Sequence, residues 1–319
     1  MTTVRAEGPC FDELEVGQVF DAAPEHTLTE GRQAVHQSIV GDRLRLPLSD
    51  ALAVRVAGAP LAHPALAWDV AIGQSTVATH HVKANLFYRD LVFHRLPRLG
   101  DTLRTTTTVV GLRENQRREG RTPTGLAALR MRTVDQEGRT VLDFHRCAML
   151  PLRGADPTGR RDDLDRIGGS TTAWTRALEG LDLGALPRGR PLAAGETIEV
   201  VGGDVVTSGP ELARLTLNVA SVHHDAVAAG GGRLVYGGHT IGIALSQAVR
   251  ALPDLVTVLG WHGCDHVGPV REGDTLRSTV RIERADPGPD GRQLVHLRSV
   301  VTSDEGGGPV LDWRFVALA

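Results

Sequence analysis

A short stretch in the second half of the chain holds residue types that together can move water and protons next to a carbonyl group. Asn218 and His223 come first, and Tyr236, Gly237 and Gly238 follow at the start of an apolar segment. His223 can take and return a proton near neutral pH, because the ordinary pKa of a histidine is about 6.5. The Asn218 amide offers both a donor and an acceptor, so it can hold a water molecule or a substrate oxygen.

The two glycines add a third chemical capability to this stretch. Backbone N–H groups at a helix N-terminus can stabilise negative charge on a carbonyl oxygen, and Gly237 and Gly238 let a ligand approach that backbone closely. A base, a water holder and an oxyanion donor suit chemistry on an α,β-unsaturated or 3-hydroxy thioester. Each signal alone has an ordinary alternative, since a single histidine is commonly structural and Gly-Gly is commonly a turn. Their combination at this spacing favours a site.

The elements that would position these residues occur twice along the chain. The segment 99–104 reads LGDTLR and 272–277 reads EGDTLR, while 141–144 reads VLDF and 310–313 reads VLDW. Landmarks in a conserved order indicate a duplicated domain. We expect a first repeat over 11–153, a polar, turn-rich linker over 154–191 and a second repeat over 192–319.

Each half contains one long apolar segment of helical type followed by strands. The helices are expected over 64–75 and 240–250, where small and apolar residues recur with helical spacing. β-Branched segments predict strands over 102–110, 126–134, 140–150, 275–282, 293–302 and 310–318, and a short helix is expected within 173–181. The pattern predicts an α+β fold with an antiparallel sheet wrapped around a central helix in each half.

Composition narrows the class of protein further. The 319 residues carry a formal net charge of −3, which gives no electrostatic footprint for nucleic acid. The three cysteines, Cys10, Cys147 and Cys264, lack CxxC spacing and fit reduced thiols in a cytoplasmic protein. No apolar run is long enough for a membrane span, and the N-terminal residues lack the apolar core of a secretory signal. Lys83 is the only lysine.

The motif Asn-x-x-x-Val-His-x-Asp at 218–225, followed by Tyr-Gly-Gly at 236–238, resembles the MaoC-like hydratase/dehydratase family. The resemblance is strongest to the subset of mesaconyl-CoA hydratases, also called β-methylmalyl-CoA dehydratases, in which asparagine replaces the usual aspartate. The segments 11–18, 110–115 and 139–143 of the first half resemble further landmarks of that subset.

The resemblance implies a double hot-dog fold and reversible addition of water to the double bond of an acyl-CoA thioester, without a cofactor. A short branched or dicarboxylic acyl group is expected, of the mesaconyl-CoA and 2-methylmalyl-CoA type. His223 would be the catalytic acid and base, Asn218 its water-positioning partner, and the Gly237 N–H, with Gly238, the group that polarises the thioester carbonyl. Asp225 matches the trailing aspartate of the motif, as a site-supporting residue.

Comparison of the two halves predicts a single active site. Superposing His63 on His239 places Asp42 opposite Asn218, Pro47 opposite His223, and Leu61-Ala62 opposite the two glycines. Because proline cannot transfer protons, the first repeat is expected to be degenerate and to serve as a wall of the acyl pocket.

Further candidate residues surround the motif. Tyr236, His239 and Arg233 are candidates for substrate binding, and Arg271 and Arg277 are additional candidates for phosphate or carboxylate. The histidines 224, 239, 262 and 266 lie near the motif in sequence, but their spacing matches no strong metal-ligand pattern, so no metal is expected. A homodimer is compatible with this fold, although two fused copies can satisfy the same strand edges internally.

Four alternative functions stay open at the level of sequence. The chain could dehydrate a 3-hydroxyacyl group on an acyl carrier protein or hydrate simple enoyl-CoA esters with the same fold. It could hydrolyse a thioester, for which the motif offers no clear carboxylate. It could also bind acyl-CoA without turnover, since the usual aspartate is absent and one half has lost its base.

Overall fold

The computed structural model describes residues 6–169 and 173–319, and its strands form one antiparallel sheet. Within the described residues the sheet has 12 strands, with the order β1-β4-β5-β6-β3-β9-β12-β11-β10-β7, β2 pairing with β4 and β8 with β10. The strands of the first repeat are β1 Val19–Phe20, β2 His26–Thr27, β3 Ala84–Phe93, β4 Thr102–Glu114, β5 Thr124–Val134 and β6 Thr140–Pro151. Those of the second are β7 Thr197–Glu199, β8 Asp204–Val205, β9 Thr257–His266, β10 Thr275–Pro287, β11 Gln293–Ser303 and β12 Gly308–Leu318.

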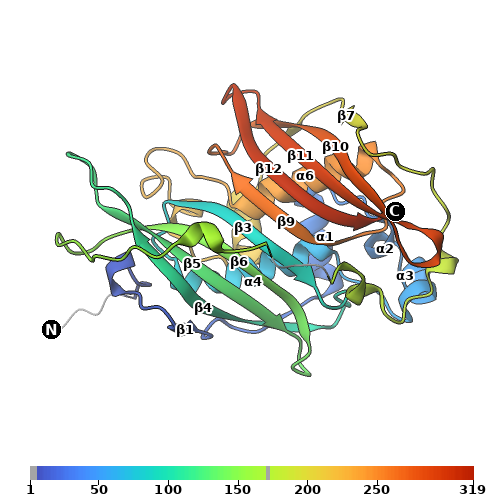
Figure 1. The fold of residues 1–319 in the computed structure, drawn as a ribbon, viewed down its shortest axis with the longest axis horizontal. Coiled ribbons are helices and arrows are strands. Elements are labelled where there is room, and N and C mark those ends of the chain that lie inside the picture. Colours follow the sequence, from blue (N-terminus) through green and yellow to red (C-terminus); the bar gives the residue numbers. More distant parts are fainter. Residues whose placement is uncertain (1–5, 170–172) are drawn as a thin grey trace.

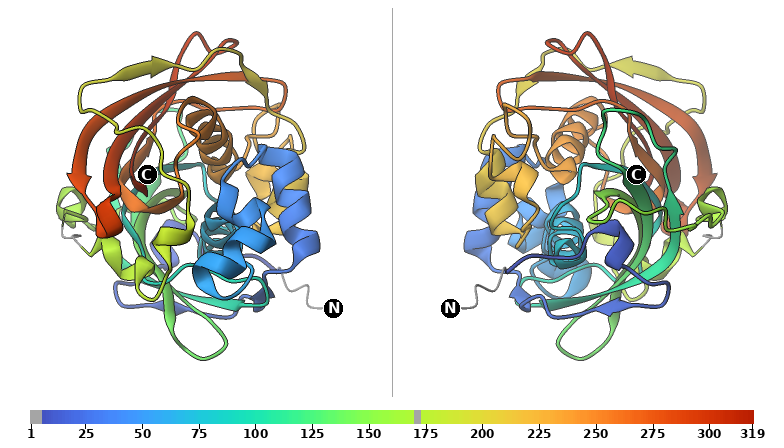
Figure 2. Two further views of the ribbon diagram at one scale, coloured as in Figure 1. Left: turned by 90° about the vertical axis from the view of Figure 1, so that its right-hand side faces the viewer. Right: turned by 90° about the vertical axis from the view of Figure 1, so that its left-hand side faces the viewer.

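The sheet curls around two long helices, one from each repeat (Figures 1 and 2). These are α4 Pro64–Gln74 and α6 Gly237–Ala251. The other helices, α1 Glu30–Val40, α2 Arg45–Leu48, α3 Asp50–Ala57 and α5 Gly209–Leu215, cover the side that the sheet leaves open. This arrangement, present twice, confirms the predicted α+β double hot-dog.

The sequence explains why the central helices can lie inside the sheet. Every residue of α4 is buried, and Pro64 occupies the first turn, where a missing backbone N–H costs nothing. Strand β4 alternates buried and more exposed residues, so Leu103, Thr105, Thr107 and Val109 face the helix. The burial pattern has period two, as the predicted strands require.

The two repeats join edge to edge through β3 and β9, two strands that the sequence reading did not assign. They pair antiparallel, with Phe87 opposite Asp265 and Leu91 opposite Trp261. Trp261 packs edge-on against Trp68 of α4, with 4.8 Å between the ring centroids. The fusion therefore pairs two strand edges inside one chain.

Short 3-10 helices connect these elements. They are η1 Phe11–Glu13, η2 Ser75–Ala78, η3 Leu164–Arg166, η4 Trp174–Leu178, η5 Leu183–Ala185, η6 Ser221–His223 and η7 Pro289–Gly291. The segment between the repeats buries Leu164 and Trp174 against the sheet and Leu183 beside α3, and the short helix expected within 173–181 is η4. The described part of the linker therefore packs against the rest of the protein through these side chains. The exact boundaries of the two repeats remain predictions. All three cysteines are buried and free.

Candidate active site

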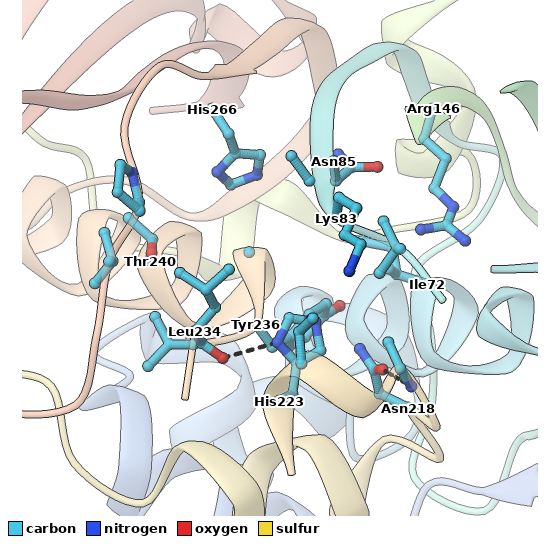
Figure 3. A pocket seen from close by; sticks show the side chains of 18 of the residues that line it. Ile72, Lys83, Asn85, Arg146, Asn218, His223, Leu234, Tyr236, Thr240 and His266 are labelled. Carbon is cyan, nitrogen blue, oxygen red and sulfur yellow. Dashed lines mark hydrogen bonds between the residues drawn. The ribbon is translucent and has the colours of Figure 1, made fainter. Parts of the chain in front are cut away.

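A cavity of about 300 Å³ lies between the two repeats and is lined by four of the predicted site residues, Asn218, His223, Tyr236 and Gly237 (Figure 3). This volume is at the lower end of the usual range for small-molecule sites. The second repeat contributes Asn218, His223, Tyr236, Gly237 and His266 to the cavity wall. The first repeat contributes the side chains of Ile72, Thr76, Lys83, Asn85, Tyr88 and Arg146, among others.

His223 ends the short helix η6 and is held in one defined orientation. Its Nδ1 lies 2.8 Å from the carbonyl oxygen of Leu234. A carbonyl only accepts, so Nδ1 carries the proton and Nε2 keeps its lone pair. Burial lowers the pKa of His223 to about 4, which leaves the imidazole neutral at pH 7. His223 is therefore poised to accept a proton.

Asn218 presents its amide group to the same cavity. Its Oδ1 accepts a hydrogen bond of 3.0 Å from the backbone N–H of Ala220, which fixes which end of the amide is oxygen. The preceding residue, Leu217, has a φ of 62°, so the chain turns sharply just before Asn218. The Nδ2 group lies on the cavity side and can donate to a water or a substrate oxygen.

The first repeat fixes this turn from outside. The hydroxyl oxygen of Thr76 in η2 accepts a hydrogen bond of 2.9 Å from the N–H of Val219. Gly73 of α4 lies against the carbonyl of Thr216 so closely that an added Cβ would be 1.7 Å from its oxygen. The position of Asn218 therefore depends on a helix of the other repeat.

Gly237 is the first residue of α6 and lines the cavity. The amides of the first helical turn have no intrahelical acceptor, so the Gly237 N–H is available at the positive end of the helix dipole. A Cβ at this position would lie 2.7 Å from Nε2 of His266. Glycine is thus the residue that permits both the helix start and the neighbouring imidazole.

A buried hydrogen-bond network holds Tyr236 beside His223. The Tyr236 hydroxyl donates to Oδ1 of Asp69 at 3.1 Å, and His36 contacts the other carboxylate oxygen at 3.1 Å. Burial raises the pKa of Tyr236 well above its usual value, so its hydroxyl keeps the proton that it donates. Its ring packs edge-on against His223, with centroids 5.9 Å apart. The network fixes one wall of the site.

Four predicted site residues do not line the cavity. Asp225 is exposed, and its carboxylate accepts from the N–H of Val227. Gly238 faces the Asp69 carboxylate, and His239 is buried one step further along α6. Arg233 pairs with Glu272 at 2.6 Å. Of the further arginines, Arg271 donates to the Gly232 carbonyl, and Arg277 forms an ion pair with Asp304 at 2.9 Å.

The structure corrects the alignment of the two repeats by one helical turn. Leu61 bridges to Arg98 and Leu234 bridges to Arg271, and those arginines precede the repeated GDTLR segments. His63 and Tyr236, the residues before α4 and α6, are therefore equivalent, and Pro64 is opposite Gly237. Because proline has no N–H, the first repeat has no backbone donor at the position that corresponds to the Gly237 N–H.

The equivalence of Asp42 and Asn218 rests on matching turns. Asp42 Oδ1 accepts from the N–H of Leu44 at 2.9 Å, which is the same turn that Asn218 makes with Ala220. In the first repeat, however, Asp42 contacts His63 at 2.6 Å in a buried pair. Asp42 of the first repeat is thus part of a buried contact with His63 in the core.

Sequence analysis predicted that the first repeat forms a wall of the pocket, but it did not identify the side chains that do so. Lys83, Asn85 and Arg146 all line it, and none belongs to a local motif. Among the described residues no group of three or more histidines, cysteines or acids is arranged to hold a metal ion. In the same part of the chain, no helix is long and apolar enough to cross a membrane.

Acid should destabilise the protein before its carboxylates titrate. Burial lowers the pKa values of His223, His239 and His266 to about 4 each. These folded-state values lie below the unfolded value of about 6.5, so the unfolded chain binds more protons as pH falls. The free energy of unfolding should drop between about pH 7 and 5.5 by roughly 1 kcal/mol for each histidine. Urea unfolding at both pH values checks this, and equal stabilities would contradict it.

Comparison with known proteins agrees with the geometry. No family model matches the chain. A mesaconyl-CoA hydratase of Cereibacter sphaeroides is 29% identical over 340 residues, covering 98% of each chain. A beta-methylmalyl-CoA dehydratase of Chloroflexus aurantiacus is 27% identical over 317 residues, covering 93% of this chain and 89% of that one.

Solved structures resemble the whole chain. A conserved hypothetical protein of Mycobacterium tuberculosis with a double hot-dog fold is 52% identical, with a TM-score of 0.92 and 99% coverage of both chains. A MaoC domain protein dehydratase from Chloroflexus aurantiacus shares the fold, with 24% identity, a TM-score of 0.88 and 99% coverage of both. The class is therefore that of double hot-dog proteins. Within it, the chain resembles hydratases and dehydratases over nearly its whole length and is an enzyme of the hydro-lyase class.

Proposed function

We propose that this protein catalyses the reversible addition of water to the double bond of a short, methyl-branched dicarboxylic enoyl-CoA, of the mesaconyl-CoA and 2-methylmalyl-CoA type. The observation that carries the proposal is that the free Nε2 of His223, the Asn218 amide and Gly237 at the start of α6 share one cavity. The names of the two curated relatives support the choice of acyl group.

The reaction follows from what each group can do. Water held by the Asn218 amide gives a proton to the neutral His223 as its oxygen bonds to the β-carbon of the thioester. Negative charge then develops on the thioester oxygen and is stabilised by the Gly237 N–H at the helix end. The protonated His223 returns the proton to the α-carbon, and the reverse sequence is dehydration.

The direct test is the loss of enoyl-thioester absorbance when the purified protein is mixed with mesaconyl-CoA, with crotonyl-CoA in parallel. Rapid hydration of mesaconyl-CoA is expected. Turnover of crotonyl-CoA alone would keep the chemistry and overturn the acyl group. Absence of turnover with both esters would overturn the proposal and favour a carrier-protein substrate or a binding-only role.

Asn218→Asp should preserve activity, with kcat/KM within about threefold of the wild type or above it. Aspartate makes the same turn in the first repeat, where Asp42 accepts from Leu44, so the local fold tolerates it. The added carboxylate also supplies a second proton acceptor. In contrast, Asn218→Leu removes the water-holding amide and should lower kcat/KM about 100-fold. Steady-state kinetics on both variants test the water-holding role of Asn218. Equal losses of kcat/KM in the two variants would refute that role.

A further inference from the structure

Three polar side chains of the first repeat stand where the second repeat has buried apolar residues. Lys83 N–H donates to the Met149 carbonyl just as Val256 N–H donates to Leu318, so Lys83 and Val256 are equivalent. The same register places Asn85 opposite Val258. Both valines are buried in the core of the second repeat.

The third position is Arg146, whose equivalent is Phe315. Two matching forked ion pairs set this register, Arg130 with Asp143 on β6 and Arg298 with Asp312 on β12. Phe315 stacks on Trp313 with 3.9 Å between the centroids, as a core residue should. A core position in one repeat has thus become a charged cavity wall in the other.

Arg146 is 2% exposed, yet no acidic residue in the described part of the chain forms an ion pair with it. Its Nη2 donates to the Thr79 hydroxyl at 2.6 Å and to the Ser75 carbonyl at 3.3 Å, which are neutral partners. Its Nε is buried and has no hydrogen-bond partner among the described residues. A buried guanidinium without a counter-charge is costly, and an anionic ligand would remove that cost.

Lys83 and Asn85 complete the same wall. Both amide atoms of Asn85 are buried without a hydrogen-bond partner among the described residues. Lys83, the only lysine of the chain, is exposed at the cavity, and Figure 3 shows its side chain directed into the space above His223. No aspartate or glutamate is among the described residues that line the cavity. The cavity therefore has two cationic groups and no internal counter-charge.

We propose that Arg146, Asn85 and Lys83 form the subsite for the free carboxylate of a dicarboxylic acyl group. The inference rests on the proposed function and names the residues that select its substrate class. Arginine suits a planar carboxylate because its N–H groups can donate in pairs, and the Asn85 amide and the Lys83 ammonium can donate from the same wall.

Burial distinguishes this anion from the phosphates of CoA. The phosphates belong to the end of CoA remote from the thioester, whereas Arg146 is deep between β6 and η2. The acyl group is the part of the substrate that reaches the base, and His223 lines the same cavity as Arg146. A carboxylate held by Arg146 would orient the double bond relative to His223 and Asn218.

The test compares mesaconyl-CoA with 2-methylcrotonyl-CoA, in which a methyl group replaces the free carboxylate. Arg146→Met should lower kcat/KM for mesaconyl-CoA about 30- to 100-fold and change that for 2-methylcrotonyl-CoA less than about threefold. Arg146→Lys should recover part of the loss. The matched control is Arg132→Met, because Arg132 lies on the exposed face of β5 and donates a hydrogen bond to Thr140. This variant should leave kcat/KM unchanged for both esters.

Folding and function are separated by two further measurements. The thermal midpoint of Arg146→Met should be no lower than that of the wild type, because methionine removes an unpaired buried charge. Lys83→Met, at an exposed position, should show the same substrate-selective loss at a smaller size, about threefold to tenfold. Equal losses on both esters in the Arg146 and Lys83 variants would overturn the subsite while leaving the hydratase proposal intact.

A binding measurement tests the subsite even if the protein turns over neither ester. Calorimetric titration of the wild type with both esters should then still favour mesaconyl-CoA, and Arg146→Met should abolish that preference. A wild-type preference that survives in Arg146→Met would overturn the subsite by itself. The proposed function would fail in that experiment through absence of turnover, so the two failures are distinguishable.

Discussion

Replacing His223 with asparagine should lower kcat/KM for enoyl-CoA hydration about 10²- to 10⁴-fold while leaving the fold intact. The imidazole donates through Nδ1 to the Leu234 carbonyl and offers only Nε2 to the cavity. An asparagine amide nitrogen occupies the Nδ1 position, so the structural hydrogen bond can be kept while the base is lost. The chemistry is thereby separated from the packing against Tyr236.

The control and the pH profile make this test sharp. His262→Asn replaces a histidine that stacks on His296 at 5.1 Å and lines no part of the cavity, so its kcat/KM should match the wild type. Since burial lowers the pKa of His223 to about 4, wild-type kcat/KM should be flat between about pH 5.5 and 8 and fall only in stronger acid. Undiminished turnover in His223→Asn would remove the base assignment.

Local patterns predicted the elements that repeat in sequence. The GDTLR segments begin β4 and β10, and the predicted strand over 140–150 is β6, Thr140–Pro151. The apolar segment after Gly237 is α6, although the helix begins a turn earlier than its apolar periodicity indicated. These elements carry their own signal because β-branched residues, small residues and turn glycines act over short distances.

The central strands were harder to predict because their stability comes from each other. Strand β3 contains Arg89 and Asp90, with a φ of 54° at Asp90, and β9 contains glycines at 260 and 263. Neither reads as a regular strand by composition. Their pairing across the repeats, and the burial of Trp261 against Trp68, supply the stabilisation that local propensity does not.

The alignment of the repeats shows how residue identity can mislead. His63 and His239 share a residue type, but the backbone bridges of Leu61 and Leu234 set the true register. Residue type and local sequence also could not identify Arg146 as a cavity residue. Its significance needs the pairing of β6 in space, and only then does its equivalence to buried Phe315 become informative.

The two repeats contribute different groups to one cavity. In our proposal the second supplies the proton-transfer machinery, and the first supplies the charged wall and the helix that supports Asn218. Part of this support is the close contact between Gly73 of α4 and the turn, so one added methyl group at that contact should strongly lower activity.

Gly73→Ala should be that substitution, costing about 3 kcal/mol of stability or more and lowering kcat/KM at least about 100-fold. The added Cβ would lie 1.7 Å from the Thr216 oxygen, 2.7 Å from its carbonyl carbon and 3.2 Å from the Asn218 nitrogen. All three are backbone atoms of the turn that carries Asn218, so the strain cannot be relieved by rotating a side chain. Either α4 or the turn must move.

Gly31→Ala is the matched control, because Gly31 also lies within a helix, α1, and a Cβ there meets nothing within 4 Å. It should be neutral or stabilising by up to about 1 kcal/mol, since alanine is the better helix former. Urea unfolding and hydration kinetics on both variants provide the comparison. If Gly73→Ala kept wild-type kcat/KM, Asn218 would not need its supported position, and the water-holding role would lose its geometric basis.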